Sequence, residues 1–188
     1  PEDDPLRVHL QYLLSTLLAD SGLMLEARTL LTTTIRLAED QNLTHTEDYA
    51  HLWDSWAGAS AALNEVTDAI FGLKKSLELF RACQSAPSLE QMNIIKGLMV
   101  MYGAQRNMDR IAQLLSEYIA VIDVLYNPRH PFLTEWLEHY EKVCATHRHQ
   151  KDAADIRRRL VEIRNRPDMT IAHPDIPPYE NEGRQEGA

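Results

Sequence analysis

The segment Cys144-x-x-His147-x-His149 contains residue types that bind zinc. A zinc site needs ligands that converge tetrahedrally, commonly paired cysteines or histidines spaced along one helix face. On a helix Cys144 and His147 would share a face, whereas His149 would point away from it. Cys83 is the only other cysteine, so a second cysteine pair is missing. We therefore expect neither a metal site nor a cofactor.

Glu135 and Glu138 are a second possible source of chemistry, because residues three apart share a helical face. Paired carboxylates do acid–base work when burial separates their pKa values, and an open surface does not desolvate them. The chain contains no G-x-S-x-G, P-loop, G-x-G-x-x-G or H-E-x-x-H motif. The sequence thus predicts a protein that is not an enzyme.

Arg157, Arg158 and Arg159 form a basic run within residues 148–166, which hold seven basic and three acidic side chains. Such a patch can dock an acidic partner, a nucleic acid or a membrane surface, or serve as the polar outer face of a terminal element. The whole chain has a net charge of −9 and a pI near 5.3. Because neutralising phosphates requires surplus Lys and Arg, we expect no nucleic-acid partner.

The 188 residues include 44% hydrophobic and 25% charged residues, which is typical of a globular protein and excludes collagen and disulfide-rich scaffolds. Mean hydropathy is −0.37 and no apolar run approaches about 18 residues, so no membrane span is expected. Two cysteines favour a reducing compartment and a cytoplasmic location. Because the first residue is Pro1, we expect a fragment or a processed chain.

Proline placement defines the elements that must position these residues. Between Leu6 and Arg166 only three prolines occur, and long proline-free stretches permit helices. Apolar residues there recur at spacings of three and four, and strand signals are missing. We predict an all-α domain over 1–166 and an extended, proline-rich tail over 167–188, either docked or loose. The predicted helices span residues 5–20, 24–40, 46–62, 66–82, 88–104, 108–125, 131–147 and 150–165.

These helices repeat in pairs at an offset of 42 residues. Small residues align at 19, 61, 103 and 145, and large apolar residues align at 10, 52, 94 and 136. A two-helix repeat of this length is the mark of an α-solenoid. Gly22, Asn64 and the Arg106-Asn107 pair are the predicted turns within pairs, with Arg148-His149 in the fourth. Thr44 or Thr46, and Ser88, are predicted helix N-caps.

The segment Leu18-Ala19-x-x-Gly22-x-x-x-Glu26-Ala27-x-x-Leu30 resembles the tetratricopeptide (TPR) repeat family, especially its long-repeat, kinesin-light-chain-like type. The stretch from Asn127 to Pro131 is similar to that family's inter-repeat loop, whereas Ile111 and Arg157 depart from its pattern. The resemblance implies a right-handed α-solenoid of about four antiparallel helix hairpins. It also implies a concave groove, lined by the first helices, that holds a peptide or a partner helix.

Carried over position by position, the resemblance assigns ten residues to that groove. They are His9, Tyr12, Thr16, His51, Asp54, Asn93, Lys96, Glu135, Glu138 and Lys142. Their mixed charge favours hydrogen bonding to a peptide backbone. A basic clamp for a terminal carboxylate is not evident, since only Lys96 and Lys142 could contribute.

We therefore expect a non-enzymatic TPR-like scaffold or adaptor that binds a peptide or partner protein in this groove. A structural subunit or assembly factor in a larger complex is the alternative, and an exposed apolar edge would be its signature. A regulatory domain of a larger signalling protein is also compatible with the sequence. Oligomers could form through the tail or the terminal repeats.

Overall fold

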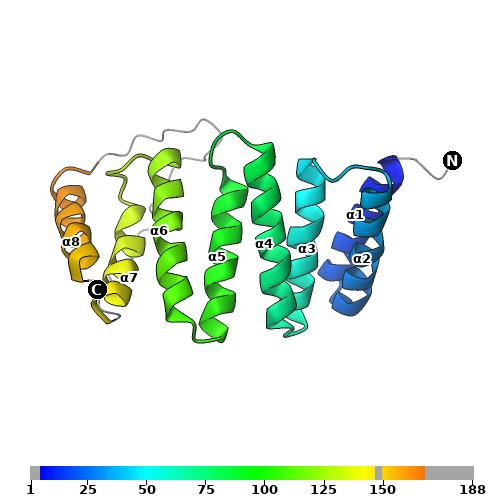
Figure 1. Ribbon diagram of the computed structural model, residues 1–188, viewed down its shortest axis with the longest axis horizontal. Coiled ribbons are helices and arrows are strands. Elements are labelled where there is room, and N and C mark those ends of the chain that lie inside the picture. The colour runs from blue at the N-terminus through cyan, green and yellow to red at the C-terminus, as the bar shows by residue number, and fades with distance from the viewer. Residues whose placement is uncertain (1–4, 147–149, 168–188) are drawn as a thin grey trace, which may run out of the picture. The chain divides into compact units, whose positions relative to one another are not determined.

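In the computed structural model, residues 5–146 and 150–167 are described, and they form eight helices and no strand (Figure 1). The all-α prediction is confirmed, and every predicted helix end lies within two residues of the observed one. The helices are α1 (Pro5–Asp20), α2 (Met24–Asp40), α3 (Glu47–Ala62), α4 (Val66–Cys83), α5 (Leu89–Ala104), α6 (Met108–Leu125), α7 (Leu133–Thr146) and α8 (Gln150–Asn165).

The chain divides into two compact units, residues 1–114 and 115–188, with the boundary inside α6. The first unit holds α1 to α5 and the start of α6, and the second holds the rest of α6 with α7 and α8. Residues 168–188 of the predicted tail lie outside the described residues, so the proposed domain division stays a prediction.

The turns inside the helix pairs repeat at the same 42-residue interval as the helices. Gly22, Asn64 and Arg106 all adopt positive φ angles, of 80°, 62° and 56°. At each turn the next amide donates back to a carbonyl five residues earlier, as from Leu23 to Leu18 at 2.9 Å. This is the Schellman geometry, in which a left-handed residue ends a helix. The three predicted turns are confirmed, and the fourth lies outside the described residues.

Two helices begin with the side-chain caps that the sequence predicts. The Thr46 hydroxyl accepts a hydrogen bond from the Tyr49 amide at 3.2 Å, and the Ser88 hydroxyl accepts one from the Gln91 amide at 3.3 Å. Each bond satisfies an amide that the first turn of a helix leaves without a backbone acceptor. Thr46, rather than Thr44, is therefore the cap of α3.

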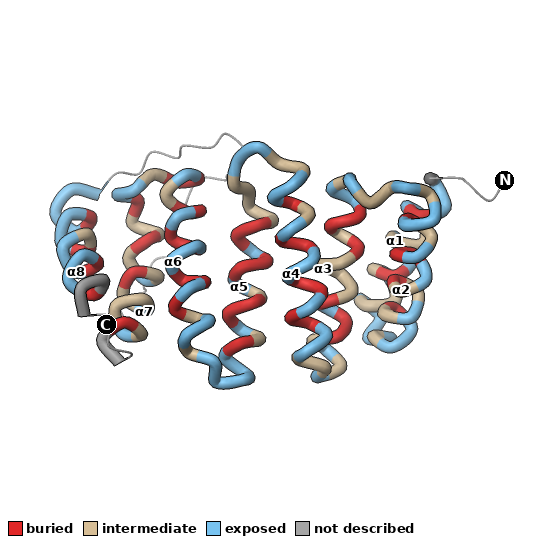
Figure 2. Tube along the Cα trace, viewed as in Figure 1, coloured by how far each residue is buried: buried red, intermediate tan, exposed pale blue. Residues whose placement is uncertain are grey.

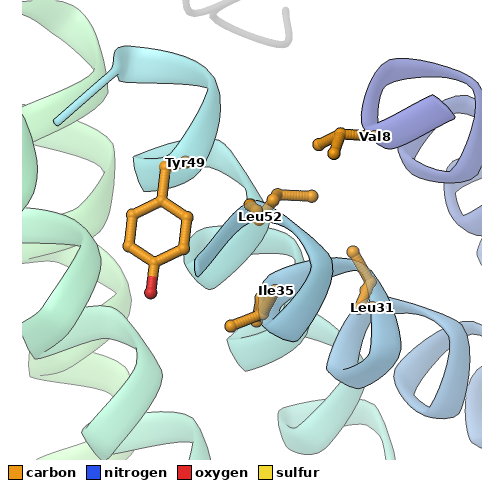
Figure 3. Packing of buried hydrophobic residues seen from close by; sticks show 6 residues of the cluster. Val8, Leu31, Ile35, Tyr49 and Leu52 are labelled. Carbon is orange, nitrogen blue, oxygen red and sulfur yellow. The ribbon is translucent and has the colours of Figure 1, made fainter. Parts of the chain in front are cut away.

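Three successive helices build the core at the start of the first unit. Val8 of α1, Leu31 and Ile35 of α2, and Tyr49 and Leu52 of α3 are all buried and form one cluster (Figure 3). Buried positions then recur along α3, α4 and α5, as the red segments of Figure 2 show. Within the first unit the apolar stripes that the sequence reveals thus pack α2, α3 and α4 against the helices before and after them.

The packing between α3 and α4 is unusually close at Gly72. A Cβ atom placed there would lie 2.9 Å from both the Ala57 Cβ and the Trp56 Cε3, distances that side chains do not tolerate. At the positions equivalent to Trp56 and Gly72, the first and third repeats have two leucines, and the fourth has Tyr and Ile. Trp56 therefore fills the volume that a second large side chain fills elsewhere, and its Nε1 donates to the Thr32 hydroxyl at 3.0 Å.

The second unit is centred on α7 and on the loop that precedes it. The Tyr118 and Trp136 rings lie 4.3 Å apart between α6 and α7, and burial raises the pKa of the Tyr118 hydroxyl. His130, in the loop, is fully buried, and its Nδ1 accepts a hydrogen bond from the Phe132 amide at 3.2 Å. This bond fixes the chain where it enters α7.

Candidate peptide-binding surface

Seven of the ten predicted groove residues lie in the first unit, on α1, α3 and α5. His9, Asn93 and Lys96 are exposed, whereas Tyr12, Thr16, His51 and Asp54 are half-buried. None belongs to the fully buried core, so these polar groups are accessible. We call this set of seven residues the first-helix face.

A pocket of about 150 Å³ opens beside this face, between α1 and α3. It is lined by Val8, His9, Tyr12, Leu43, Thr46, Asp48, Tyr49 and Leu52. Val8, Tyr49 and Leu52 are buried and make part of its wall apolar, while His9 and Asp48 are exposed polar residues. We call it the α1–α3 pocket.

Of the residues that line the pocket, the sequence predicts only His9 and Tyr12 as binding residues. Asp48 and Tyr49 follow the Thr46 cap, which the sequence marks only as the start of a helix. The packing of α3 beside α1 brings the first turn of α3 to the pocket, and the repeat alignment does not reveal this. The signal available in the sequence for these pocket residues is an acidic residue, Asp48, and an aromatic residue, Tyr49, soon after the cap.

Tyr49 is held rigidly in the pocket wall. Its hydroxyl donates to the Glu39 Oε1 at 2.8 Å, and its ring meets the Trp53 ring edge-on at 6.4 Å. Burial raises the pKa of the Tyr49 hydroxyl, so this hydroxyl stays protonated and remains a donor. The wall is thus preorganised before any ligand arrives.

The size of the pocket limits what it can receive. At about 150 Å³ it is smaller than the roughly 300–1,000 Å³ of pockets that enclose small molecules and cofactors. A single apolar side chain of a peptide is of matching size. Within the pocket the apolar wall can bury that side chain, while His9 and Asp48 can contact the polar atoms beside it.

His51 and Asp54 form a second polar group on α3, one helical turn apart. The His51 ring packs edge-on against Phe80 at 4.9 Å. Burial raises the pKa of the Asp54 carboxyl above its ordinary value, and His51 partly opposes this rise. The carboxylate of Asp54 is thus partly desolvated at neutral pH, a state that strengthens its attraction for a donor or a cation.

Replacing Asp54 with asparagine should therefore stabilise the fold at neutral pH. The native pKa is raised, so the ionised carboxylate is less favourable in the folded than in the unfolded chain, and wild-type stability falls as pH rises between the two values. The gain from Asp54→Asn should be greatest at pH 7 and vanish near pH 3, as measured by urea unfolding. A gain independent of pH would contradict the raised pKa.

The three predicted groove residues of the second unit lie on α7 and differ in surroundings. Glu135 and Lys142 are exposed, whereas the Glu138 carboxylate pairs with Arg164 of α8 at 2.6 Å. Glu138 is therefore engaged within its own unit. The Glu138 carboxylate thus pairs with Arg164, whereas the Glu135 side chain is exposed to solvent.

Each arginine of the basic run has an acidic partner within the second unit. Arg157 pairs with Glu141 at 2.5 Å and Arg158 with Asp155 at 2.9 Å. Arg159 pairs with Asp123.

Arg159 is also the least exposed of the three, with a side chain 24% exposed, and it donates to the Pro128 carbonyl at 3.0 Å. It borders a cavity of about 320 Å³ among α6, α7 and α8. Arg159 thus ties α8 to the loop after α6, while docking of an acidic partner on this run stays a prediction.

Cys144, His147 and His149 carry the zinc-binding residue types of the sequence. Cys144 is buried, and the two histidines lie outside the described residues. Across residues 5–146 and 150–167, no group of three or more His, Cys, Asp or Glu side chains is arranged to hold a metal ion. In the same residues no helix is both long and apolar enough to cross a membrane.

Comparison with known proteins gives structural matches only. No protein-family model and no curated protein matches the sequence. The crystal structure of BtubC (BKLC) from P. vanneervenii aligns with 84% of this chain at 18% identity and a TM-score of 0.66. The alignment covers 63% of BtubC, so this chain spans less than two thirds of it.

A second crystal structure shows the same architecture. The putative kinesin light chain of Podosopora anserina, with nearly identical TPR-like repeats, aligns with 86% of this chain and 77% of its own at 15% identity and a TM-score of 0.67. At such identities the likeness concerns the fold alone. The resemblance seen in the sequence is confirmed at that level: the chain has the TPR-like helical repeat fold, an all-α solenoid of antiparallel helix pairs.

Proposed function

We propose that this chain is a non-enzymatic protein-interaction module that binds an extended peptide segment of a partner protein. The TPR-like fold supports this proposal, because stacked helix pairs expose long faces that suit extended ligands. The first-helix face adds accessible donors and acceptors, among them His9, Asn93 and Lys96. Such groups can bond to a peptide backbone.

The α1–α3 pocket is the observation that carries the proposal. Recognition of a peptide commonly needs one buried apolar anchor surrounded by polar contacts. The pocket offers Val8 and Leu52 for the anchor, with the exposed His9 and Asp48 beside them. The exposed carboxylate of Asp48 in the pocket lining and the chain's net charge of −9 favour a cationic residue next to that anchor. The proposed ligand is therefore an extended peptide with a medium-sized apolar residue and a neighbouring Lys or Arg.

Selection from a displayed library of random peptides tests this proposal. We expect the 188-residue chain to enrich peptides with that pattern. Asp48→Lys should weaken the binding of a recovered peptide about tenfold. This factor corresponds to a loss of roughly 1.4 kcal/mol of binding free energy, caused by reversing the charge at one contact. Binding is measured by fluorescence anisotropy with a labelled peptide.

Glu47→Lys is the matched control for this substitution. Glu47 and Asp48 are both exposed acids in the first turn of α3, so both variants lose the same favourable interaction with the helix N-terminus. Only Asp48 lines the pocket. Equal affinities of the two variants would show that the pocket is not where the peptide binds.

A further inference from the structure

Helix α1 exposes a row of leucines at the N-terminal end of the first unit. Leu6, Leu10, Leu13 and Leu17 are 57%, 55%, 44% and 62% exposed. Leucine side chains on a folded protein's surface are normally isolated, whereas these four follow one another along a single helix. We call them the leucine seam.

The leucine seam runs along the side of α1 opposite its buried side. Val8 and Ser15 are the buried residues of α1, at 7% and 1% exposure. At about 100° per residue, the four leucines centre on the opposite side of the helix from these two. Their spacing of four, three and four is that of the contact positions in a two-helix coiled coil. The seam is thus shaped for one further helix.

The repeat pattern shows what covers this face elsewhere in the first unit. Leu52 and Ala59 of α3 stand 42 residues after Leu10 and Leu17, and they are only 1% and 4% exposed. Leu52 belongs to the cluster formed with Leu31 and Ile35 of α2 (Figure 3). At these two positions α3 is therefore buried in the core, while Leu10 and Leu17 of α1 are exposed.

We propose that a second copy of this chain covers the leucine seam, with its α1 antiparallel to the first. The spacing of four, three and four is the same in both chain directions, so in an antiparallel pair each leucine of the seam faces another leucine. Leu6 then faces Leu17 of the second copy, and Leu10 faces Leu13 of the second copy. A two-fold interface requires this reciprocity, in which each contact occurs twice.

The position of Arg7 and the area of the seam are compatible with this arrangement. In the same register Arg7 comes opposite Thr16 of the second copy, so two like charges do not meet there. The leucine seam with the adjoining Leu14, itself 50% exposed, would remove roughly 1,000 Å² from water over both copies, the lower limit for a specific interface. Interfaces at this lower limit are commonly weak, and we expect a dissociation constant of roughly 1–10 µM.

Analytical ultracentrifugation of the 188-residue chain measures this association. We expect a dimer that dissociates in the low micromolar range. Leu10→Asp and Leu13→Lys should each weaken it at least about 100-fold, since each inserts two charges into an apolar seam. Leu25→Asp is the matched control, because Leu25 on α2 is 57% exposed and lies outside the seam.

Mixing the Leu10→Asp and Leu13→Lys variants tests the direction of the helices. In an antiparallel pair Asp at 10 meets Lys at 13 and the remaining leucines meet each other, so the mixture should dimerise again. In a parallel pair position 10 faces position 10 and position 13 faces position 13, so the Asp and the Lys do not meet. A wild-type chain that stays monomeric at roughly 100 µM, or a mixture that fails to associate, would overturn the proposal. So would a dimer that only Leu25→Asp disrupts.

Discussion

Gly72→Leu should destabilise the first unit by about 3 kcal/mol or more, because the new side chain has no room between α3 and α4. Even a Cβ atom at this position would approach the Ala57 Cβ and the Trp56 Cε3 to 2.9 Å. Trp56 cannot withdraw freely, because its Nε1 donates to Thr32 at 3.0 Å. The added side chain must therefore push the two helices apart. Urea unfolding, followed by circular dichroism, measures the loss.

A compensating substitution tests this explanation directly. Trp56→Leu combined with Gly72→Leu recreates the pair of leucines found at Leu98 and Leu114. The double variant should recover most of the stability lost by Gly72→Leu alone, because the total volume is again that of the other repeats. Strictly additive losses would show that the two side chains do not share one space.

Gly58 supplies the matched control for Gly72. It lies in α3, is exposed, and a Cβ atom there would meet nothing within 4 Å. Gly58→Leu should be neutral or stabilising by up to about 1 kcal/mol, since glycine disfavours a helix interior. A loss at Gly58 as large as that at Gly72 would mean that the size of the new side chain, and not the close approach, is responsible.

His130→Ala should destabilise the second unit by about 2–4 kcal/mol. The side chain is fully buried, and its ring centre lies 5.0 Å from that of Tyr126. Removing the ring leaves a cavity and leaves the Phe132 amide without the Nδ1 acceptor it now uses at 3.2 Å. Thermal unfolding monitored by calorimetry measures the change.

Two further variants separate the hydrogen bond from the packing. His130→Asn keeps an acceptor near the position of Nδ1, so it should retain part of the stability that alanine loses. His139→Ala is the control, because His139 is exposed on α7, and its effect should stay within about 0.5 kcal/mol. If asparagine and alanine cost the same at position 130, the bond to Phe132 contributes nothing to stability.

The helices and their pairing could be predicted from the sequence because both depend on local spacing. Apolar residues at intervals of three and four define helix faces, and Gly22 and Asn64 are residue types that tolerate positive φ. Arg106 adopts the same conformation although it is not such a type. Its turn follows from the 42-residue repeat and not from its own conformational preference.

Contacts between helices could not be predicted from the sequence, because the spacing of residues within one helix does not identify the residues that pack against it. The volume exchange between Trp56 and Gly72 involves residues 16 apart, and the pairing of Arg159 with Asp123 involves residues 36 apart. The repeat alignment also identified His9 and Tyr12 without the residues that complete their pocket. Asp48 and Tyr49 join them only once α3 packs beside α1.

Mapping a bound peptide by amide chemical shifts tests most directly whether this chain is a peptide-binding module. A labelled 188-residue chain is titrated with a peptide recovered from the random library. The largest chemical-shift changes should fall in residues 8–12 and 43–52, around the α1–α3 pocket, and Asp48→Lys should remove them while Glu47→Lys should not. Changes confined to α2 and α4, or no saturable change with any recovered peptide, would contradict this prediction.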